Sequence, residues 1–361
     1  MTRSQINMDF SKHSNRCDIV LLSWNNTHLI KKCVESIFEN TRLPCHLIIV
    51  DNNSKPETRD YLKTLESTDT VKVTLDFNDK NEGFSKGMNR GLRKVTAPYA
   101  CILNNDTEVT RGWLNRSIEI LEKNPHIGVM NPQSNIFGVP YTKDVSEKIE
   151  TQNTFKEMGM CIGFCMFIRK DVIEKIGYLD AESYPGYFFE DSDYSKRVKK
   201  AGYICALAQN AYVYHQEHQS VNKLSTKEEL FKQNQKNFYA KWGKPKRILV
   251  ALHTPVTWET HFENLLPLAK DDHFITVLTD APPPSQNNLH TQIGIQKISS
   301  PFFKPFVIFR LLTKLKKPYD YLFIPQPDLQ QFFEKTHLLY RRPLIKTYSE
   351  LNTILHNENP N

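Results

Sequence analysis

An acidic cluster, Glu190-Asp191-Ser192-Asp193, directly follows the aromatic stretch Tyr184-Pro185-Gly186-Tyr187-Phe188-Phe189. Neighbouring carboxylates repel one another, and aromatic surroundings disfavour their ionised form. Such a cluster either begins a solvated helix or holds a carboxylate ready to accept a proton. A second polar cluster, Asn104-Asn105-Asp106, ends an apolar run and offers a metal ligand. The two clusters together favour group transfer from a phosphate-containing donor.

The pattern of apolar residues along the chain indicates the strands and helices that position these clusters. Runs rich in Ile, Val and Leu at 17–23, 46–50 and 99–103 predict strands buried on both faces. Helices are expected at 29–38, 58–65 and within 81–95, with a short strand at 71–75. Strands that alternate with helices in this way predict an open α/β sheet, mostly parallel.

Polar residues follow three of these strands: Ser23-Trp24-Asn25, Asp51-Asn52-Asn53 and Asn104-Asn105-Asp106. Ligands of open α/β sheets bind beyond the carboxyl ends of the strands. The sequence therefore predicts a ligand site at this edge.

Further elements are expected downstream: an internal strand at 159–168, a helix at 192–201, a strand at 211–215 that delivers His215, and a helix at 227–242. Gly243-Lys244-Pro245-Lys246 then breaks the pattern. A fresh α/β series is predicted at 247–252, 261–269, 274–278, 305–317, 319–324, 329–338 and 343–347. We expect a polar N-terminal extension at 1–16, a first domain at 17–243 and a Rossmann-like, incomplete α/β domain at 244–361.

Composition and net charge limit the class of protein and the partners that we expect. The chain has 361 residues, 39% hydrophobic and 24% charged, with a formal net charge of +7 that is spread along it. This modest charge permits an anionic partner but does not require one, and we expect no nucleic-acid partner. Seven scattered cysteines without CxxC spacing argue for a reducing compartment and against zinc. With no apolar signal core and no membrane-length apolar run, we expect a cytoplasmic protein that contacts a membrane at most peripherally.

Seven segments resemble family 2 glycosyltransferases, closest to the bacterial rhamnosyltransferase-like branch. In order they are CDIVLLSWNN, LIIVDNNS, NEGFSKGMNRGL, CILNNDTEVTRGWL, GFCMFIRKDVIEKIGYLD, YFFEDSDYSKRVKKAGY and VYHQEHQS. The resemblance spans residues 18–242. It implies a GT-A fold and inverting sugar transfer from a nucleoside-diphosphate sugar, with Mn²⁺ or Mg²⁺ bridging the diphosphate.

Asn104-Asn105-Asp106 stands where the family carries its DxD motif, with Asn104 in place of the first acid. Asp106 is then the carboxylate ligand; alternatively it caps the helix that follows. The family pattern places His215 near the metal and diphosphate, although a structural role is as plausible and His218 competes for the position.

Asp191 resembles the general base, which takes the proton of the acceptor hydroxyl. Glu190 is expected to orient the acceptor or the base, and Asp193 to cap the following helix. The alternative is that the whole cluster caps that helix.

Donor-side residues are also implied by the resemblance. They are Ser23, Trp24, Asn25, Asp51, Asn53, Asn81, Gly83, Asn89, Asn104 and Asn105. Asp51 would contact the nucleobase, unless it forms an Asx-turn. Gly83 lets the backbone approach the nucleotide closely, whereas helix capping is the alternative for the asparagines. Trp24 either lines the nucleotide site or packs in the core.

The last third resembles, more weakly, the acceptor-side half of GT-B glycosyltransferases, through RILVALHTP, FITVLTD and YDYLFIPQPD. The stretch 301–317 mixes aromatic, Leu and Lys residues, a pattern that suits an anionic bilayer. We expect instead an ordinary helix packed on its own sheet.

The predicted donor is dTDP-rhamnose or a UDP-sugar, and the predicted acceptor is a hydroxyl of a bacterial surface glycan or a lipid-linked sugar. Two other classes stay open. A non-catalytic nucleotide-sugar-binding scaffold is favoured by the loss of the first DxD acid. A nucleotidyltransferase is disfavoured because no glycine-rich basic loop follows the first strand.

Overall fold

A computed structural model describes residues 15–149, 154–216, 227–282, 290–313, 317–340 and 342–358. The chain forms two compact units. The first unit consists of Met1–Phe155 and Cys161–Asn234, and the second consists of Lys156–Met160 and Gln235–Asn361. The change of unit falls inside a helix, whereas the sequence predicts a boundary at residue 243. Among the described residues, no helix has the length and apolarity that crossing a bilayer requires.

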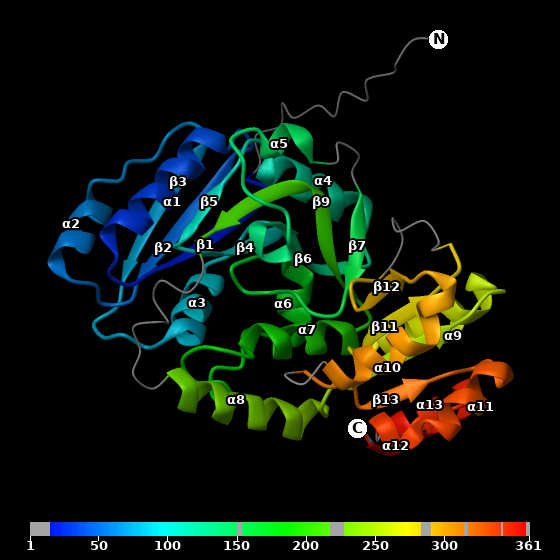
Figure 1. The fold of residues 1–361 in the computed structure, drawn as a ribbon. Coiled ribbons are helices and arrows are strands. Elements are labelled where there is room, and N and C mark those ends of the chain that lie inside the picture. Colours follow the sequence, from blue (N-terminus) through cyan, green and yellow to red (C-terminus); the bar gives the residue numbers. More distant parts are fainter. Residues whose placement is uncertain are drawn as a thin grey trace, which may run out of the picture. The chain divides into compact units, whose positions relative to one another are not determined.

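The first unit is an open sheet with helices on both faces (Figure 1). Its strands are β1 (Cys17–Ser23), β2 (Cys45–Asp51), β3 (Val71–Phe77), β4 (Tyr99–Asn104), β5 (Thr107–Val109), β6 (Ile127–Gln133), β8 (Cys165–Arg169) and β9 (Ile204–His215). Its helices are α1 (Thr27–Asn40), α2 (Pro56–Lys63), α3 (Phe84–Leu92), α4 (Trp113–Lys123), α5 (Val145–Lys148), α6 (Lys170–Ile176) and α7 (Glu190–Lys200). Strand β7 (Phe155–Met158) spans the first change of unit along the chain, and helix α8 (Lys227–Trp242) spans the last.

The strand order is β3-β2-β1-β4-β8-β6-β9-β5. The first four strands are parallel, while β8 runs antiparallel to both of its neighbours and β5 runs antiparallel to β9. Ser23 pairs with Asp51, and Leu22 pairs with Asn104. The predicted convergence of polar strand ends at one sheet edge is therefore confirmed.

Alternate residues of the buried strands pack on opposite faces. Ile19, Leu21 and their neighbours on β2 form one cluster with apolar residues of α1 and α4. On the other face α3 lies so close to β1 that a Cβ on Gly91 would meet Val20 Cγ1 at 2.3 Å. This close approach brings the N-terminus of α3 to the edge where the polar residues gather.

Two predicted strands have different bounds in the structure. The strand expected at 159–168 begins only at Cys165, because backbone N–H groups before it bond to side chains instead of a neighbouring strand. The strand expected at 211–215 begins at Ile204. Its first half, ICALAQN, carries few β-branched residues and gives a weak strand signal.

The second unit holds a five-stranded sheet of order β12-β11-β10-β13-β14, parallel at every pairing. Its elements are β10 (Arg247–Leu252), α9 (Trp258–Lys270), β11 (Phe274–Thr279), β12 (Ile293–Lys297), α10 (Phe303–Thr313), β13 (Tyr321–Phe323), α11 (Pro327–Lys335), α12 (His337–Tyr340), β14 (Leu344–Ile345) and α13 (Tyr348–Glu358). The predicted Rossmann-like α/β architecture is confirmed. Strand β12 and helix α13 were not anticipated from the sequence.

Candidate active site

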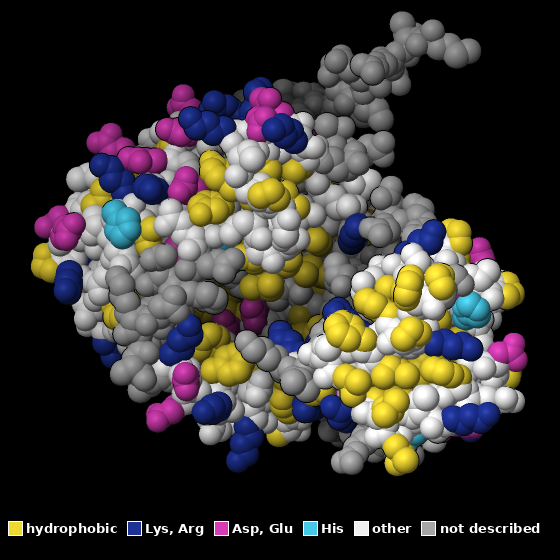
Figure 2. All heavy atoms as spheres, in the orientation of Figure 1, with side chains coloured by type: hydrophobic (Ala, Val, Ile, Leu, Met, Phe, Trp, Pro, Cys, Tyr) yellow, Lys and Arg dark blue, Asp and Glu magenta, His cyan; other side chains and the backbone are white. Residues whose placement is uncertain are grey.

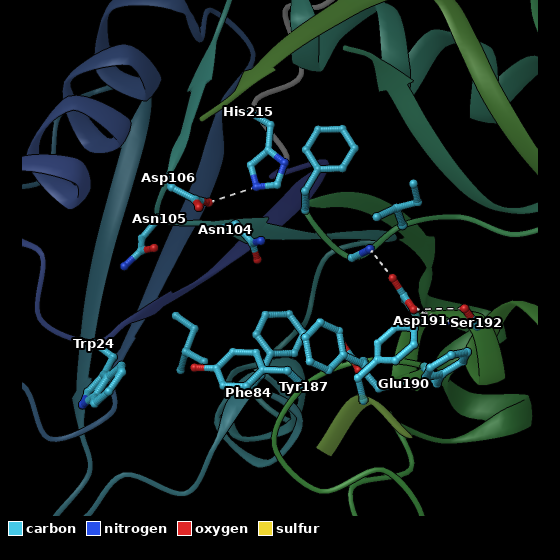
Figure 3. A pocket seen from close by; sticks show the side chains of 17 residues that line it. Trp24, Phe84, Asn104, Asn105, Asp106, Tyr187, Glu190, Asp191, Ser192 and His215 are labelled. Carbon is cyan, nitrogen blue, oxygen red and sulfur yellow. Dashed lines mark hydrogen bonds and ion pairs between the residues drawn. The ribbon is translucent and has the colours of Figure 1, made fainter. Parts of the chain in front are cut away.

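A pocket of about 380 Å³ opens at the carboxyl edge of the first sheet. Figure 3 shows Asp106 and His215 on one side of it, Glu190 and Asp191 on another, and Trp24 apart from both. Its lining residues are Leu22, Trp24, Phe84, Asn104, Asn105, Asp106, Ile162, Gly163, Phe164, Tyr187, Phe188, Phe189, Glu190, Asp191, Ser192, His215 and Phe231. Seven predicted site residues thus meet in one pocket.

Asp106 and His215 are brought together by strand pairing. Strand β5 follows Asp106 and pairs antiparallel with the end of β9, with Thr107 opposite His215. His215 Nε2 lies 3.1 Å from Asp106 Oδ1, and both residues are buried. Helix α4 begins only at Trp113, after β5, so the alternative of Asp106 as the cap of the next helix is wrong.

The chemistry of this pair fits a divalent cation. A carboxylate oxygen suits Mn²⁺ and Mg²⁺, and an imidazole nitrogen suits Mn²⁺ better. His215 Nδ1 is buried and has no hydrogen-bond partner among the described residues. Within the described ranges no group of three or more His, Cys, Asp or Glu residues has the geometry of a metal site. Asp106 and His215 can therefore hold a cation only if ligand oxygens or water complete its shell.

The acid pair opens helix α7, whose first residue is Glu190. The Gly163 N–H donates to Asp191 Oδ2 at 3.0 Å, and the Ser192 N–H donates to Asp191 Oδ1 at 2.6 Å. Burial raises the pKa of Asp191 above its ordinary value, although these hydrogen bonds oppose the rise. Burial, and then the neighbouring Asp191 charge, raise the pKa of Glu190 well above its ordinary value. Glu190 Oε2 has no hydrogen-bond partner among the described residues.

Asp193 does not cap this helix. It lies within the first turn, three residues after the helix begins, and its carboxylate accepts from Arg197 Nε at 2.8 Å. The residue before the helix is Phe189, which makes no side-chain cap. The prediction of a capping Asp193 is therefore wrong, because the helix starts at Glu190 rather than two residues later.

The loop that precedes β8 links the two halves of the pocket. Gly163 donates to Asp191, while the Phe164 carbonyl accepts from the Asn104 N–H at 2.8 Å. The Phe164 ring stacks on the His215 ring with centroids 5.2 Å apart. Two neighbouring residues thus contact both the acid pair and the strand end that carries Asp106.

Asn234 of α8 was not anticipated from the sequence. Its Nδ2 donates to the carbonyls of Tyr187 at 2.8 Å and of Pro185 and Phe188 at 3.2 Å. Phe188 and Phe189 have φ values of 80° and 71°, a region that costs non-glycine residues free energy. Asn234 is fully buried and so holds this strained turn against α8. An asparagine inside a polar helix gives no such signal in sequence.

The donor-side residues divide between the pocket and its surroundings. Trp24, Asn104 and Asn105 line the pocket. Asn25 and Trp24 also line a neighbouring cavity of about 430 Å³ near the start of α1. The Ser23 side chain is buried and has no hydrogen-bond partner in the part of the chain that the structure describes, and Asn53 is exposed.

Asp51 lies outside both cavities. Its Oδ2 accepts from the Ser54 N–H at 3.1 Å and lies 3.5 Å from Arg59 Nε, while Oδ1 is buried and no described residue bonds to it. The turn-forming role weighed from the sequence is therefore present. A contact to a nucleobase stays a prediction.

Asn52, its neighbour, organises the loop before α3. Asn52 Nδ2 donates to Asn81 Oδ1 at 2.8 Å and to the Gly83 carbonyl at 3.1 Å, while its Oδ1 accepts from Asn78. Gly83 has a φ of 81° and a Cβ there would lie 3.3 Å from Gly186 Cα. Asn81 and Gly83 are thus fixed by Asn52, which the sequence did not single out.

Asn89 is occupied elsewhere. Its side-chain amide bonds to both the N–H and the carbonyl of Leu179, at 3.0 and 2.8 Å. Because it does not line the main pocket, we assign it the task of fixing α3 to the segment before α7. His218, the competitor of His215, lies outside the described residues.

Comparison with known proteins agrees with this geometry. Residues 18–177 match the family model described as Glycosyl transferase family 2. The match confirms the resemblance drawn from the seven segments.

Two curated relatives are similar over part of the chain. An uncharacterized glycosyltransferase of Haemophilus influenzae is 24% identical over 112 residues, which are 31% of this chain and 34% of the relative. The putative teichuronic acid biosynthesis glycosyltransferase TuaG of Bacillus subtilis is 24% identical over 103 residues, 28% of this chain and 40% of TuaG. The chain therefore spans about a third to two fifths of these relatives.

Solved structures resemble the chain weakly. S. aureus TarS is 12% identical with a TM-score of 0.47, over 70% of this chain and 42% of TarS. The mannosyltransferase PcManGT of Pyrobaculum calidifontis, in complex with GDP-Man and Mn²⁺, is 15% identical with a TM-score of 0.44, over 58% of this chain and 59% of that protein.

Replacing Asn234 with alanine should loosen the turn before the acid pair. Three carbonyls would lose their donor, so we expect the free energy of unfolding to fall by about 1–3 kcal/mol. Hydrogen–deuterium exchange of residues 186–192 should also speed up. Lys236→Ala, an exposed change on the same helix, is the matched control. Unchanged exchange in Asn234→Ala would show that Asn234 does not hold the turn.

Replacing Glu190 with glutamine should stabilise the protein at high pH. The raised folded-state pKa means that the folded protein holds the proton of Glu190 more tightly than the unfolded chain does. Protonated Glu190 therefore stabilises the fold at pH values below the ordinary pKa of 4.5, and this stabilisation is lost as pH rises through the folded-state pKa. We expect Glu190→Gln to melt at a higher temperature than the native protein at pH 8, with the difference closing towards pH 4. Glu66→Gln, at an exposed loop position, controls for the loss of one negative charge. A difference independent of pH would contradict the raised pKa.

Proposed function

We propose that this protein is an inverting, divalent-cation-dependent glycosyltransferase. It moves a sugar from a nucleoside-diphosphate sugar, dTDP-rhamnose or a UDP-sugar, to a hydroxyl of a bacterial surface glycan or a lipid-linked acceptor. The observation that carries the proposal is the single pocket with a desolvated acid pair on one side and the Asp106–His215 pair on another. The match of residues 18–177 to the family 2 glycosyltransferase model supports it, as does the similarity to TuaG, a putative teichuronic acid biosynthesis glycosyltransferase.

Asp191 acts as the general base in this proposal. Its backbone donors hold both carboxylate oxygens, so the side chain is oriented before the acceptor arrives. Burial raises the pKa of Asp191, which makes its carboxylate a stronger base than that of an ordinary aspartate. As the acceptor oxygen bonds to the anomeric carbon, the proton of the acceptor hydroxyl passes to Asp191. The bond between the anomeric carbon and the diphosphate oxygen breaks, and its electron pair leaves with the diphosphate.

Asp106 and His215 receive the diphosphate end. A bound Mn²⁺ or Mg²⁺ would supply positive charge there for the negative charge that develops on the leaving group. Asn104, in place of a second acid, lowers the negative charge of the cation site. The donor would therefore bind together with the cation rather than after it.

Aromatic side chains form the wall beside the acid pair. The ring centroids of Phe84 and Tyr187 lie 6.0 Å apart. The ring centroid of Phe231 on α8 lies 5.3 Å from the centroids of both Phe188 and Phe189. This wall limits water near Asp191, so a sugar hydroxyl meets the base in preference to water.

Replacing Asp191 with asparagine should abolish transfer and leave donor binding intact. The amide has nearly the same shape but cannot accept the proton, so we expect kcat to fall by roughly 10²–10⁴-fold. Turnover is followed by nucleotide release, and donor binding by thermal shift. Asp60→Asn, an exposed aspartate on α2, is the control. Turnover within about twofold of the native rate would remove Asp191 as the base.

Replacing Asp106 with asparagine should remove the metal dependence of donor binding. Native protein mixed with dTDP-rhamnose or a panel of UDP-sugars should be stabilised more strongly when Mn²⁺ or Mg²⁺ is present. In Asp106→Asn we expect the metal-free shift to persist and the metal increment to disappear. Glu108→Gln, on the adjacent strand, is the matched control.

Two outcomes would change the conclusion. An equal metal increment in Asp106→Asn would remove Asp106 as a ligand. Donor binding without turnover towards any acceptor or water would favour the non-catalytic scaffold, which the loss of the first acid at Asn104 already suggests.

A further inference from the structure

Helix α10 of the second unit is apolar on two faces. Phe303, Val307 and Leu311 are spaced four residues apart and are buried against the sheet. Phe302, Phe309 and Leu312 form a second stripe and are 67%, 57% and 47% exposed. A helix that packs only on its own sheet needs one apolar stripe. The second stripe has no structural use within this unit.

Helix α12 extends the exposed apolar surface. It packs against α10, and its Leu338 and Leu339 are 84% and 59% exposed. Phe302, Phe309, Leu312, Leu338 and Leu339 are together called the apolar patch. Figure 2 shows hydrophobic side chains gathered over this part of the second unit, with lysine and arginine side chains beside them.

The charge of this stretch is strongly one-sided. Residues 300–342 contain eight lysines and arginines against three aspartates and glutamates, a net charge of +5 out of +7 for the whole chain. Lys304 lies over the Phe332 ring at 5.2 Å from its centroid, and Lys317 is exposed. Basic side chains thus accompany the exposed aromatic and leucine side chains.

We propose that the apolar patch and its cations dock the protein on an anionic lipid bilayer. Exposed Phe and Leu enter the boundary between headgroups and acyl chains, and Lys and Arg pair with anionic headgroups. A second copy of the chain is a poorer occupant, because a two-fold contact would bring two surfaces of the same positive charge together. The helix expected within 301–317 does pack on its own sheet, and the inference adds a bilayer contact made by its exposed stripe. It does not depend on the proposed transfer reaction.

Vesicle co-sedimentation of the full chain tests the proposal. We expect binding to vesicles of 30% phosphatidylglycerol in phosphatidylcholine, and roughly tenfold weaker binding to pure phosphatidylcholine or in 0.5 M NaCl. The double variant Phe309→Ser/Leu338→Ser should lose at least about fivefold in bound fraction. Phe274→Ser, which removes a partly exposed aromatic from the start of β11 in the same unit, should bind as the native chain does.

Charge reversal provides a second, independent readout. Lys304→Glu/Lys317→Glu changes only exposed side chains and should weaken binding to the anionic vesicles without lowering the melting temperature. Failure of the native chain to sediment with anionic vesicles would overturn the proposal. Sedimentation that neither double variant reduces would also overturn it. A third contrary outcome is a dimer in analytical ultracentrifugation that Phe309→Ser/Leu338→Ser dissociates, with no vesicle binding by the native chain.

Discussion

The two-residue link through Gly163 and Phe164 is the interaction on which the rest of the site depends. The Gly163 N–H donates to the Asp191 side chain of α7, and the Phe164 carbonyl accepts from the Asn104 N–H at the end of β4. The same two residues therefore set the spacing between the acid pair and the Asp106–His215 pair. Chemistry that joins a base to a distant leaving group needs such a fixed spacing, since small misplacements cost rate steeply.

Around that link the protein maintains an unfavourable arrangement. Two carboxyl groups lie together in a desolvated turn, and two bulky residues before them take left-handed backbone conformations. The opposing stabilisation comes from hydrogen bonds to Asp191 and from Asn234, which reaches three carbonyls from α8. Strain and raised pKa values at one site are typical of a functional centre supported by its surroundings.

The second unit shows a different use of apolar residues. Its sheet is covered on one face by α9 and α13 and on the other by α10, α11 and α12. Burial of both faces completes the core, so the exposed phenylalanines and leucines add nothing to it. A lipid surface gives these side chains an apolar environment and gives the excess cations a counter-charge. The protein would then combine a soluble-type catalytic fold with a surface suited to a membrane.

Local pattern was enough to predict much of this protein. Apolar runs and turn residues predicted the parallel strands β1, β2 and β4, and their polar ends meet at one edge because the strands pair in register. The acid pair could be chosen because carboxylates directly after aromatics are unusual, whereas the roles predicted for Asp106 and His215 came from the resemblance to family 2 glycosyltransferases. The strands and the acid pair needed only neighbours along the chain.

Tertiary structure alone decided the rest. The start of β8, the helical start at Glu190 and the roles of Asn52, Asn89 and Asn234 depend on hydrogen bonds between residues far apart in sequence. An asparagine amide looks the same in sequence whether it caps a helix, faces solvent or holds a loop. The exposure of the second stripe of α10 likewise depends on which face the sheet covers. Sequence determined which chemical groups are present and which elements carry them; packing determined which partners those groups meet.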